Sequence, residues 1–456
     1  MGTEKTKKKS SLTLPDVYDY LDENLWLPKY NVITRSLEVA PMARNDMKLY
    51  TSPERELQNF IVKLTDELKQ LYNSVSIETV TQYLYYIATT DISKEYSGHS
   101  LAYNPVEYGI NAMSERYTDT PDKLPELYEL MHIPEEDTLS RTLIHKWLLQ
   151  ALAILKNGYV YKGKKRVFGL DGILVLNGAQ GIGKSRLAAA LVSPFSNYTQ
   201  TPLFGSGSIK LEQKDTIIQA TNKWIFEIGE IEYSFKRSDV SDFKQFITRD
   251  TDELRSPYGH RAESYYRRTS FIASCNTSDY LLDTTGNRRF WTIPLSEKFD
   301  FEKLDNFDFG ALWVQIAIEL ERSDLQCFRL STEEQNALAL RNGDFLAKAP
   351  AQQEIEDIYT SVIANPDMYE YRYTTVTAFA AEHTELAKYN ARTIGKALRI
   401  ALEQAGEEYQ TKNIREKNRS APFKAVLLPM RKKQNIQVVA RSSGSNPYEL
   451  VSDMTS

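Results

Sequence analysis

The pattern of apolar and polar residues divides the chain into stretches of different character. Between Glu54 and Tyr72 the apolar residues recur at the spacing of an amphipathic helix. A second apolar stripe runs from Leu143 to Leu152, after a helix-start signal at Pro134 to Asp137. We therefore expect a helical lead-in and oligomerisation region over residues 101–165, behind an N-terminal domain of unknown role over residues 1–100.

Short, continuous apolar runs occupy the middle third of the chain. They lie at residues 171–177, 224–228 and 271–274, and such runs are typical of strands buried on both faces of a parallel sheet. The segment after the first run, Arg186 to Val192, is rich in Ala and Leu and predicts a helix. Residues 166–340 are thus expected to form an α/β core with a parallel sheet.

The last part of the chain follows a segment, Asn342 to Pro350, that is typical of a linker. Beyond it we predict helices at Thr374 to His383 and Ala391 to Ala405, then a strand at Ala421 to Leu428. Two helices joined by a short turn and followed by a β-wing predict a winged-helix domain over residues 350–456.

Composition narrows the class of protein. The 456 residues are 41% hydrophobic and 26% charged, which is typical of soluble globular domains and indicates more than one of them. No apolar run approaches the ~20 residues of a membrane span, and no export leader follows the basic N-terminal tail, which we expect to be a disordered arm. The two cysteines, Cys275 and Cys327, predict neither a disulfide framework nor a zinc site and fit a reducing cytoplasm.

The charge is uneven along the chain. The formal net charge is −5, yet Lys388 to Lys433 holds twelve Lys or Arg against four Glu. Contact with nucleic acid should therefore be local. Within this basic stretch Arg392, Lys396 and Arg399 share one side of a predicted helix, which suits a helix that contacts DNA; a merely solvated face is the alternative.

The strongest motif is the segment from Gly178 to Ser185. It matches G-x-x-x-x-G-K-S/T in full, with a predicted strand before it and a helix after it. The glycines Gly178, Gly181 and Gly183 let backbone N–H groups surround phosphates, Lys184 would meet the β- and γ-phosphates of ATP, and Ser185 would bind Mg²⁺. The sequence predicts an ATP site.

Such a site also needs acidic and polar groups at the ends of neighbouring strands. Glu227 ends the second apolar run and Glu230 follows it, so one is expected to contact Mg²⁺ and the other to act as general base, in an order that stays open. Asn276 ends the third run and is suited to orient the attacking water. Surface carboxylates and a turn residue are the alternatives.

Two arginines follow at Arg288 and Arg289, beside bulky apolar residues. A guanidinium neutralises charge on a transferring phosphoryl group, so one of them is a candidate arginine finger; structural salt bridges are the alternative. Between the second and third runs, two β-capable arms surround Pro257-Tyr258-Gly259, and they predict a hairpin whose tip carries Tyr258, His260 and Arg261 for a sugar-phosphate backbone. A plain surface hairpin is the alternative.

Together these motifs resemble the virulence-associated protein E group of replication proteins from phages and pathogenicity islands, itself similar to superfamily 3 helicases of the AAA+ class. The resemblance covers roughly residues 100–335. It rests on the segment Gly178 to Ser185, which we call the P-loop, and on the acidic residues Glu227 and Glu230. It also rests on Lys244-Gln-Phe-Ile-Thr with the hairpin after it, on Asn276, and on Gly286-Asn-Arg-Arg-Phe290.

The resemblance implies a hexameric ring that encircles single-stranded DNA, hydrolyses ATP between subunits and moves a hairpin along one strand. It implies DNA contact by Lys244, Tyr258, His260 and Arg261, and action of Arg288 or Arg289 on the neighbour's γ-phosphate. Recognition of a duplex origin is expected from the C-terminal domain, in the cytoplasm of a bacterial host. Primase activity is not expected, because residues 1–100 lack a zinc-ligand cluster and paired polymerase carboxylates.

Two other functions stay open from the sequence. An ATP-switched DNA-binding regulator would bind DNA without separating strands. A phosphotransferase kinase is a weaker alternative, disfavoured by the hairpin and by the basic C-terminal domain. Glu230 and the two arginines favour hydrolysis, because a switch needs no full set of water-activating and charge-neutralising groups.

Overall fold

The computed structural model describes residues 11–41, 53–90, 101–117, 121–161, 164–229, 231, 240–255, 262–277, 279–281, 286–347, 351–404, 408–415 and 423–432. The chain divides into two compact units, Met1–Ala347 and Lys348–Ser456. Over these ranges no helix is both long and apolar enough to cross a lipid bilayer.

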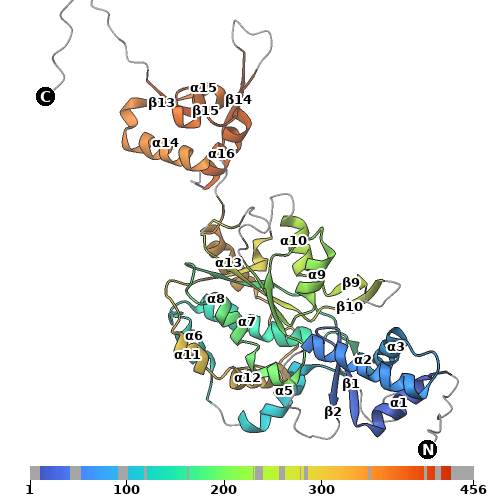
Figure 1. The fold of residues 1–456 in the computed structure, drawn as a ribbon. Helices are drawn as coiled ribbons and strands as arrows, with labels where there is room; N and C mark the ends of the chain where they lie inside the picture. Colours follow the sequence, from blue (N-terminus) through green and yellow to red (C-terminus); the bar gives the residue numbers. More distant parts are fainter. Residues whose placement is uncertain are drawn as a thin grey trace, which may run out of the picture. The chain divides into compact units, whose positions relative to one another are not determined.

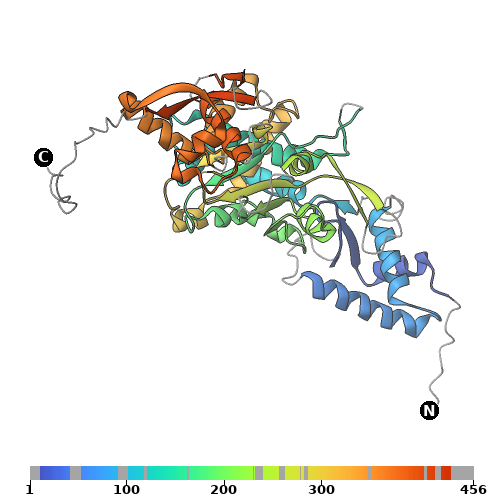
Figure 2. The ribbon, with the colours of Figure 1, turned by 90° about the horizontal axis from the view of Figure 1, so that it is seen from above.

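The first unit begins with a small α/β segment (Figure 2, blue). Its elements are α1 (Leu14–Glu23), β1 (Trp26–Asn31), β2 (Ser36–Pro41), α2 (Pro53–Leu71), α3 (Ile77–Thr89) and β3 (Ala102–Tyr103). The strands form a sheet of order β2-β1-β3, in which β1 is antiparallel to β2 and parallel to β3. The helix α2 is the one expected from the apolar spacing, and its Leu64 and Leu68 are buried against Val80 and Leu84 of α3.

The centre of the first unit is a five-stranded parallel sheet, which confirms the predicted α/β core (Figure 1). Its strands are β6 (Ile173–Asn177), β7 (Phe204–Gly207), β8 (Ile225–Ile228), β11 (Ser270–Cys275) and β12 (Phe290–Pro294). They lie side by side in the order β12-β6-β11-β8-β7, so the strand before Asn276 runs between the strand that leads into the P-loop and the strand that carries Glu227.

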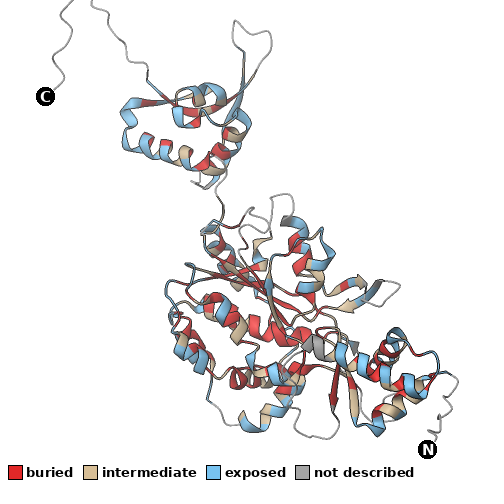
Figure 3. Ribbon diagram, viewed as in Figure 1, coloured by how far each residue is buried: buried red, intermediate tan, exposed pale blue. Residues whose placement is uncertain are grey.

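Alternate residues of these strands enter two separate apolar cores, one on each face of the sheet. Leu174 and Leu176 of β6 belong to the first core, whereas Ile173 and Val175 belong to the second. Because both faces are covered, the strands are apolar throughout, as a continuous run predicts. In Figure 3 the buried residues follow the strands and the inner sides of the helices.

Helices cover both faces of the sheet (Figure 1). The first core includes side chains from α7, α8 and α12, and the second includes side chains from α9 and α10. Two tryptophans of the helices in the first core are held by hydrogen bonds. The indole N–H of Trp147 donates to Phe271 O at 2.9 Å, and the indole N–H of Trp313 donates to Leu191 O at 2.7 Å. The helices of the core and its lead-in are α5 (Pro105–Ser114), α6 (Leu124–Leu130), α7 (Thr138–Ala153), α8 (Lys184–Ala190), α9 (Lys214–Thr221), α10 (Val240–Ile247), α11 (Phe301–Asn306), α12 (Phe309–Arg322) and α13 (Thr332–Gly343), with 3₁₀ turns η1 (Glu115–Tyr117), η2 (Ile154–Lys156), η3 (Ser193–Tyr198) and η5 (Asn287–Arg289).

Two antiparallel hairpins extend from this core. One is the short pair β4 (Val160–Tyr161) and β5 (Lys164–Lys165). The other is the predicted hairpin, built from β9 (Thr251–Arg255) and β10 (Ala262–Tyr266).

The second unit combines helices with a three-stranded antiparallel sheet of order β13-β15-β14. Its elements are α14 (Gln352–Ala364), η6 (Pro366–Met368), β13 (Tyr369–Thr374), α15 (Val376–Ala381), η7 (Thr384–Leu386), α16 (Ala391–Gln404), β14 (Thr411–Ile414) and β15 (Phe423–Arg431). The helix expected to start at Thr374 begins instead at Val376, because the hydroxyl of Thr375 caps it by accepting from Ala378 N at 3.1 Å.

Candidate nucleotide site

The loop from Gly178 to Gly183 joins the end of β6 to the start of α8. Backbone hydrogen bonds fix its entry: Gly178 N donates to Cys275 O at 3.1 Å and Leu295 N donates to Asn177 O at 2.7 Å. The loop is therefore held between the ends of β11 and β12, at the edge of the sheet where parallel strands present their carboxyl ends.

The glycines of the loop meet a conformational requirement. Gly181 and Gly183 have φ angles of +81° and +113°, a region that L side chains rarely adopt. A Cβ on Gly183 would lie 2.8 Å from the ring of Phe301 and 2.9 Å from that of Phe299, whereas a Cβ on Gly181 would meet nothing within 4 Å. The loop is packed on one side and open on the other, as a phosphate-binding loop requires.

Lys184 lies at the centre of the site, and the residue is only 7% exposed. Its ammonium donates to Gly178 O at 2.6 Å, to Ala179 O at 2.9 Å and to Asn276 Oδ1 at 2.9 Å. The P-loop lysine and the amide after β11, 92 residues apart in the chain, are thus in direct contact.

A second contact joins the P-loop to β8. The hydroxyl of Ser185 donates to Glu227 Oε1 at 2.6 Å, and Glu227 is buried with 3% exposure. A hydroxyl and a carboxylate oxygen are hard ligands of the type that Mg²⁺ prefers. The structure therefore brings together four residues expected at an ATP–Mg²⁺ site: Lys184, Ser185, Glu227 and Asn276.

Other expected residues lie outside the described part of the chain. These are Glu230, from the acidic pair, and Tyr258, His260 and Arg261, from the hairpin tip.

The two arginines lie in the loop between β11 and β12. Gly286, with φ +67°, introduces the turn η5, which carries Arg288 and Arg289. Arg288 is exposed and its Nη1 donates to Gln335 Oε1 at 3.5 Å, and Arg289 is half-buried. Neither arginine forms an ion pair with another residue that the structure describes, so neither is held in a salt bridge there.

Lys244 lies on α10, close to the loop that carries Arg288 and Arg289. The residue is 6% exposed on α10, its Nζ lies 3.4 Å from Asn287 Oδ1, and it lies 5.9 Å from the centre of the Phe290 ring. Lys244 thus contacts the loop that carries the two arginines, and its expected DNA contact stays a prediction.

The base of the β9–β10 hairpin is fixed by a buried ion pair. The guanidinium of Arg267, which follows β10, forms two hydrogen bonds with the carboxylate of Asp252 on β9, and its Nη1 donates to Phe246 O at 2.6 Å. Both side chains are almost inaccessible, at 1% and 3%. The hairpin is thereby anchored to α10, the helix that also carries Lys244.

The N-terminal segment contacts the same hairpin. Arg35 in the β1–β2 turn donates to Thr221 Oγ1 at 2.9 Å and lies 5.3 Å from the centre of the Tyr265 ring on β10. Burial lowers the pKa of the Arg35 guanidinium. Burial, followed by the hydrogen bond to Glu263, raises the pKa of Tyr265 to about 12. Tyr265 therefore stays neutral near neutral pH.

In the second unit, the basic residues singled out from the sequence lie on α16. Arg392, Lys396 and Arg399 are exposed, while Ile394 and Leu398 on the same helix are 1% and 0% exposed. The helix is therefore amphipathic, with a basic outer side.

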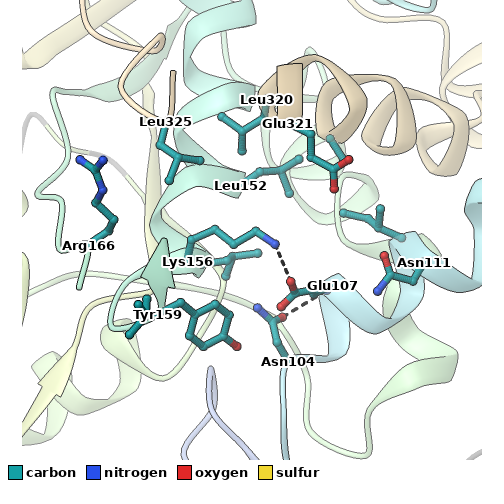
Figure 4. A pocket seen from close by; sticks show the side chains of 14 residues that line it. Asn104, Glu107, Asn111, Leu152, Lys156, Tyr159, Arg166, Leu320, Glu321 and Leu325 are labelled. Atoms are coloured by element: carbon teal, nitrogen blue, oxygen red, sulfur yellow. Dashed lines mark hydrogen bonds and ion pairs between the residues drawn. The ribbon is translucent and has the colours of Figure 1, made fainter. Parts of the chain in front are cut away.

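A separate cavity of about 340 Å³ opens between α5, η2, β4 and α12 (Figure 4). Leu152 and Leu155 contribute to its apolar wall, and an ion pair between Glu107 and Lys156 lies at its polar side. The cavity lies near the end of α7 that contacts Gly172, just before β6, whereas the P-loop follows the opposite end of that strand. It is therefore distinct from the nucleotide site.

Sequence reasoning missed several residues of this arrangement. Phe299 and Phe301 close one side of the P-loop, and Phe299 N donates to Ile182 O at 2.9 Å. Two aromatic residues shortly after the last core strand were the available signal. The role of Arg35 had no local signal, because its partner Thr221 is distant in the chain. For Asp252 and Arg267 the predicted hairpin was the available signal, since its two arms bring them together.

Comparisons with known proteins agree with the resemblance. The model of the virulence-associated protein E-like domain matches residues 113–346. No curated protein matches the chain.

Three solved structures are similar to the chain at low identity. The apo NrS-1 C-terminal region is 12% identical, with a TM-score of 0.39, over 90% of this chain and 98% of that chain. The SCCmec type IV Cch, described as an active helicase, is 15% identical, with a TM-score of 0.30, over 65% of this chain and 68% of that chain. A JCV helicase bound to a small molecule is 10% identical, with a TM-score of 0.27, over 61% of this chain and 79% of that chain. The family match spans more than half of the 456 residues, and the chain therefore belongs to the virulence-associated protein E-like domain family.

Proposed function

We propose that this protein is an ATP-hydrolysing DNA helicase of the AAA+ class that initiates replication of a phage or genomic island. The observation that carries the proposal is the meeting of Lys184, Ser185, Glu227 and Asn276 at one edge of the parallel sheet. These four residues come from three strand ends that are far apart in the chain. Their convergence is the arrangement that phosphoryl transfer needs, because catalysis there depends on positioning and charge stabilisation.

Each residue has a separate task in this proposal. Lys184 and the backbone N–H groups of the P-loop bind the β- and γ-phosphates, and Asn276 orients the attacking water. Ser185 and Glu227 would hold Mg²⁺, which supplies charge neutralisation on the phosphates when it is bound. Glu227 or Glu230 acts as general base.

Hydrolysis is proposed to occur between the subunits of a ring, with a hexamer as the expected assembly. Arg288 is exposed and Arg289 is half-buried, and neither is held in an ion pair with another described residue, which suits a group that reaches a neighbour's γ-phosphate. The β9–β10 hairpin would move along single-stranded DNA in the pore through Tyr258, His260 and Arg261. Its buried Asp252–Arg267 pair gives it a rigid base for that work.

The C-terminal unit is proposed to be a winged-helix domain that binds the duplex origin. Two helices, α15 and α16, precede an antiparallel pair β14–β15, and α16 exposes Arg392, Lys396 and Arg399. This order and this basic side support insertion of α16 into a DNA groove. The proposed organisation is an N-terminal domain (1–100), a helical lead-in (101–165), the ATPase core (166–340) and the winged helix (350–456).

Strand displacement on a forked DNA, together with ATP hydrolysis, tests this function. Lys184→Ala should abolish both activities. Arg288→Ala and Arg289→Ala are compared with Arg322→Ala, which removes an exposed arginine at the end of α12. The alanine variant of the arginine finger should bind ATP, fail to hydrolyse it, and inhibit the unmodified protein when the two are mixed. Arg322→Ala should bind and hydrolyse ATP like the unmodified protein and should not inhibit it. DNA-dependent ATP hydrolysis without strand separation would contradict the helicase and favour an ATP-controlled DNA-binding regulator.

A further inference from the structure

The sheet of the C-terminal unit has two chemically different faces. Val426, Leu428 and Met430 alternate along the central strand β15 and are 4%, 0% and 2% exposed, in the apolar core that the helices complete. Since side chains alternate along a strand, the residues between them face the other side of the sheet. This second face is the one considered below.

Two tyrosines stand on the second face. Tyr371 and Tyr373 lie two residues apart on β13 and are 53% and 37% exposed. They are paired in register with Pro429 and Leu427 of β15, which places them opposite the core side of the strand. Side chains two residues apart on a strand stand about 7 Å apart, which leaves room for one flat ring against each tyrosine.

A lysine approaches these rings from the other edge strand. Lys412 on β14 pairs in register with Ala425, and its Nζ lies 5.7 Å from the centre of the Tyr373 ring. The small side chain of Ala425 lets the lysine stem extend across the central strand. An aromatic ring and a cation are therefore presented together on one surface.

The charge of this face is positive. By the register of the three strands, its described positions include Lys412 and no Asp or Glu. The acidic residue of β13, Glu370, pairs in register with Met430 and belongs to the core side. A ligand of this face should therefore be anionic and should carry flat rings.

We propose that the face of the β13-β15-β14 sheet that carries Tyr371, Tyr373 and Lys412 binds single-stranded DNA. Bases stack on the two tyrosine rings, and Lys412 attracts the phosphates. Aromatic platforms beside basic groups bind single strands in this way with little sequence preference. The site differs from the basic side of α16, and its binding does not depend on ATP hydrolysis.

The first test measures binding of a labelled oligo(dT) to the full chain by fluorescence anisotropy, without nucleotide. All proteins carry His260→Ala and Arg261→Ala, so that the proposed hairpin contributes little. Tyr371→Ala with Tyr373→Ala should weaken binding at least tenfold, the order expected for lost base stacking. The matched control is Tyr86→Ala, which removes a 44% exposed tyrosine of α3, and it should bind like its parent.

Three further measurements separate stacking from a structural effect. The double variant Tyr371→Phe and Tyr373→Phe should bind like its parent, because the rings remain. Lys412→Ala should reduce the slope of log affinity against log salt by about 0.7, the contribution of one phosphate contact on a single strand. Photo-crosslinking of an iodouracil oligonucleotide, mapped by mass spectrometry, should modify Tyr371 or Tyr373.

The proposal is overturned if the alanine pair binds oligo(dT) like its parent while crosslinks map elsewhere. It is also overturned if the alanine pair loses affinity for duplex DNA and for oligo(dT) equally, or if the parent binds oligo(U) RNA but not oligo(dT). Because no ATP is present, failure here leaves the ATPase and strand-displacement results unaffected, and the two proposals fail independently.

Discussion

The hydroxyl of Ser185 donates a hydrogen bond of 2.6 Å to the carboxylate of Glu227, across 42 residues of chain. Ser185 lies in the first turn of α8, which follows β6, and Glu227 lies in β8. The two residues meet because only β11 separates β6 from β8 in the sheet. The pair joins the two parts of the candidate site that would share a divalent cation. It also makes the site testable by small, nearly isosteric changes.

Glu227→Gln should retain ATP binding and lose hydrolysis by about a hundredfold or more, the usual contribution of a general base or of a carboxylate that orders the catalytic centre. Steady-state phosphate release and equilibrium nucleotide binding measure the two effects separately. Glu302→Gln, which neutralises an exposed carboxylate of α11, is the matched control and should hydrolyse ATP at the parental rate. An unchanged rate in Glu227→Gln would remove this residue from the catalytic set.

Gly183→Ala should weaken ATP binding far more than Gly181→Ala. Both positions have positive φ, so both variants carry backbone strain on the order of 1 kcal/mol. Only the Cβ at 183 collides with neighbours, the rings of Phe299 and Phe301 at 2.9 and 2.8 Å. Nucleotide titration and thermal unfolding of the two variants measure the difference, and equal losses would show that the aromatic packing is unimportant.

The grouping of Lys184, Ser185, Glu227 and Asn276 rests on local signals in the sequence. The P-loop residues are consecutive, and Glu227 and Asn276 directly follow or end apolar runs, so the parallel sheet brings them together. The contacts Lys184 to Asn276 and Ser185 to Glu227 also depend on the strand order β6-β11-β8, which the sequence pattern did not predict.

Features that depend on distant partners could not be predicted. Lys244 is buried beside Asn287, which is 43 residues away, and no local feature of the sequence predicts that contact. The strand β13 had a local signal, because its tyrosines alternate with charged residues, but its pairing with β15 could not be predicted. Tertiary contacts of this kind override local preference.

The Asp252–Arg267 pair should be required for the stability of the first unit. Arg267→Met leaves a buried carboxylate without its cation, and breaking such a pair costs about 3–5 kcal/mol. The double variant Arg267→Met with Asp252→Leu removes both charges and should recover most of this loss. Urea unfolding followed by tryptophan fluorescence reports on this unit, because all five tryptophans lie within it. A double variant as unstable as the single one would show that the hydrogen bond to Phe246 O matters more than the charge.

His383 should make the stability of the C-terminal unit depend on pH. The residue is 3% exposed beside the Phe379 ring, and its buried Nε2 has no hydrogen-bond partner among the residues that the structure describes. Burial lowers its pKa below 6.5. The carboxylates of Glu385 and Glu382 oppose this shift and Arg431 adds to it. Because the unfolded chain binds this proton more readily, the contribution of His383 is present above pH 6.5 and is lost as pH falls through the lower pKa of the folded state. Urea unfolding followed by circular dichroism gives the free energy of unfolding at pH 7.5 and at pH 5.5. The difference between these two free energies should be smaller in His383→Gln than in the parent. His132→Gln, which replaces an exposed histidine of the first unit, is the control and should show the same difference as the parent. If the free energy of unfolding changed with pH equally in the parent and in His383→Gln, the imidazole would be protonated as readily in the folded unit as in water.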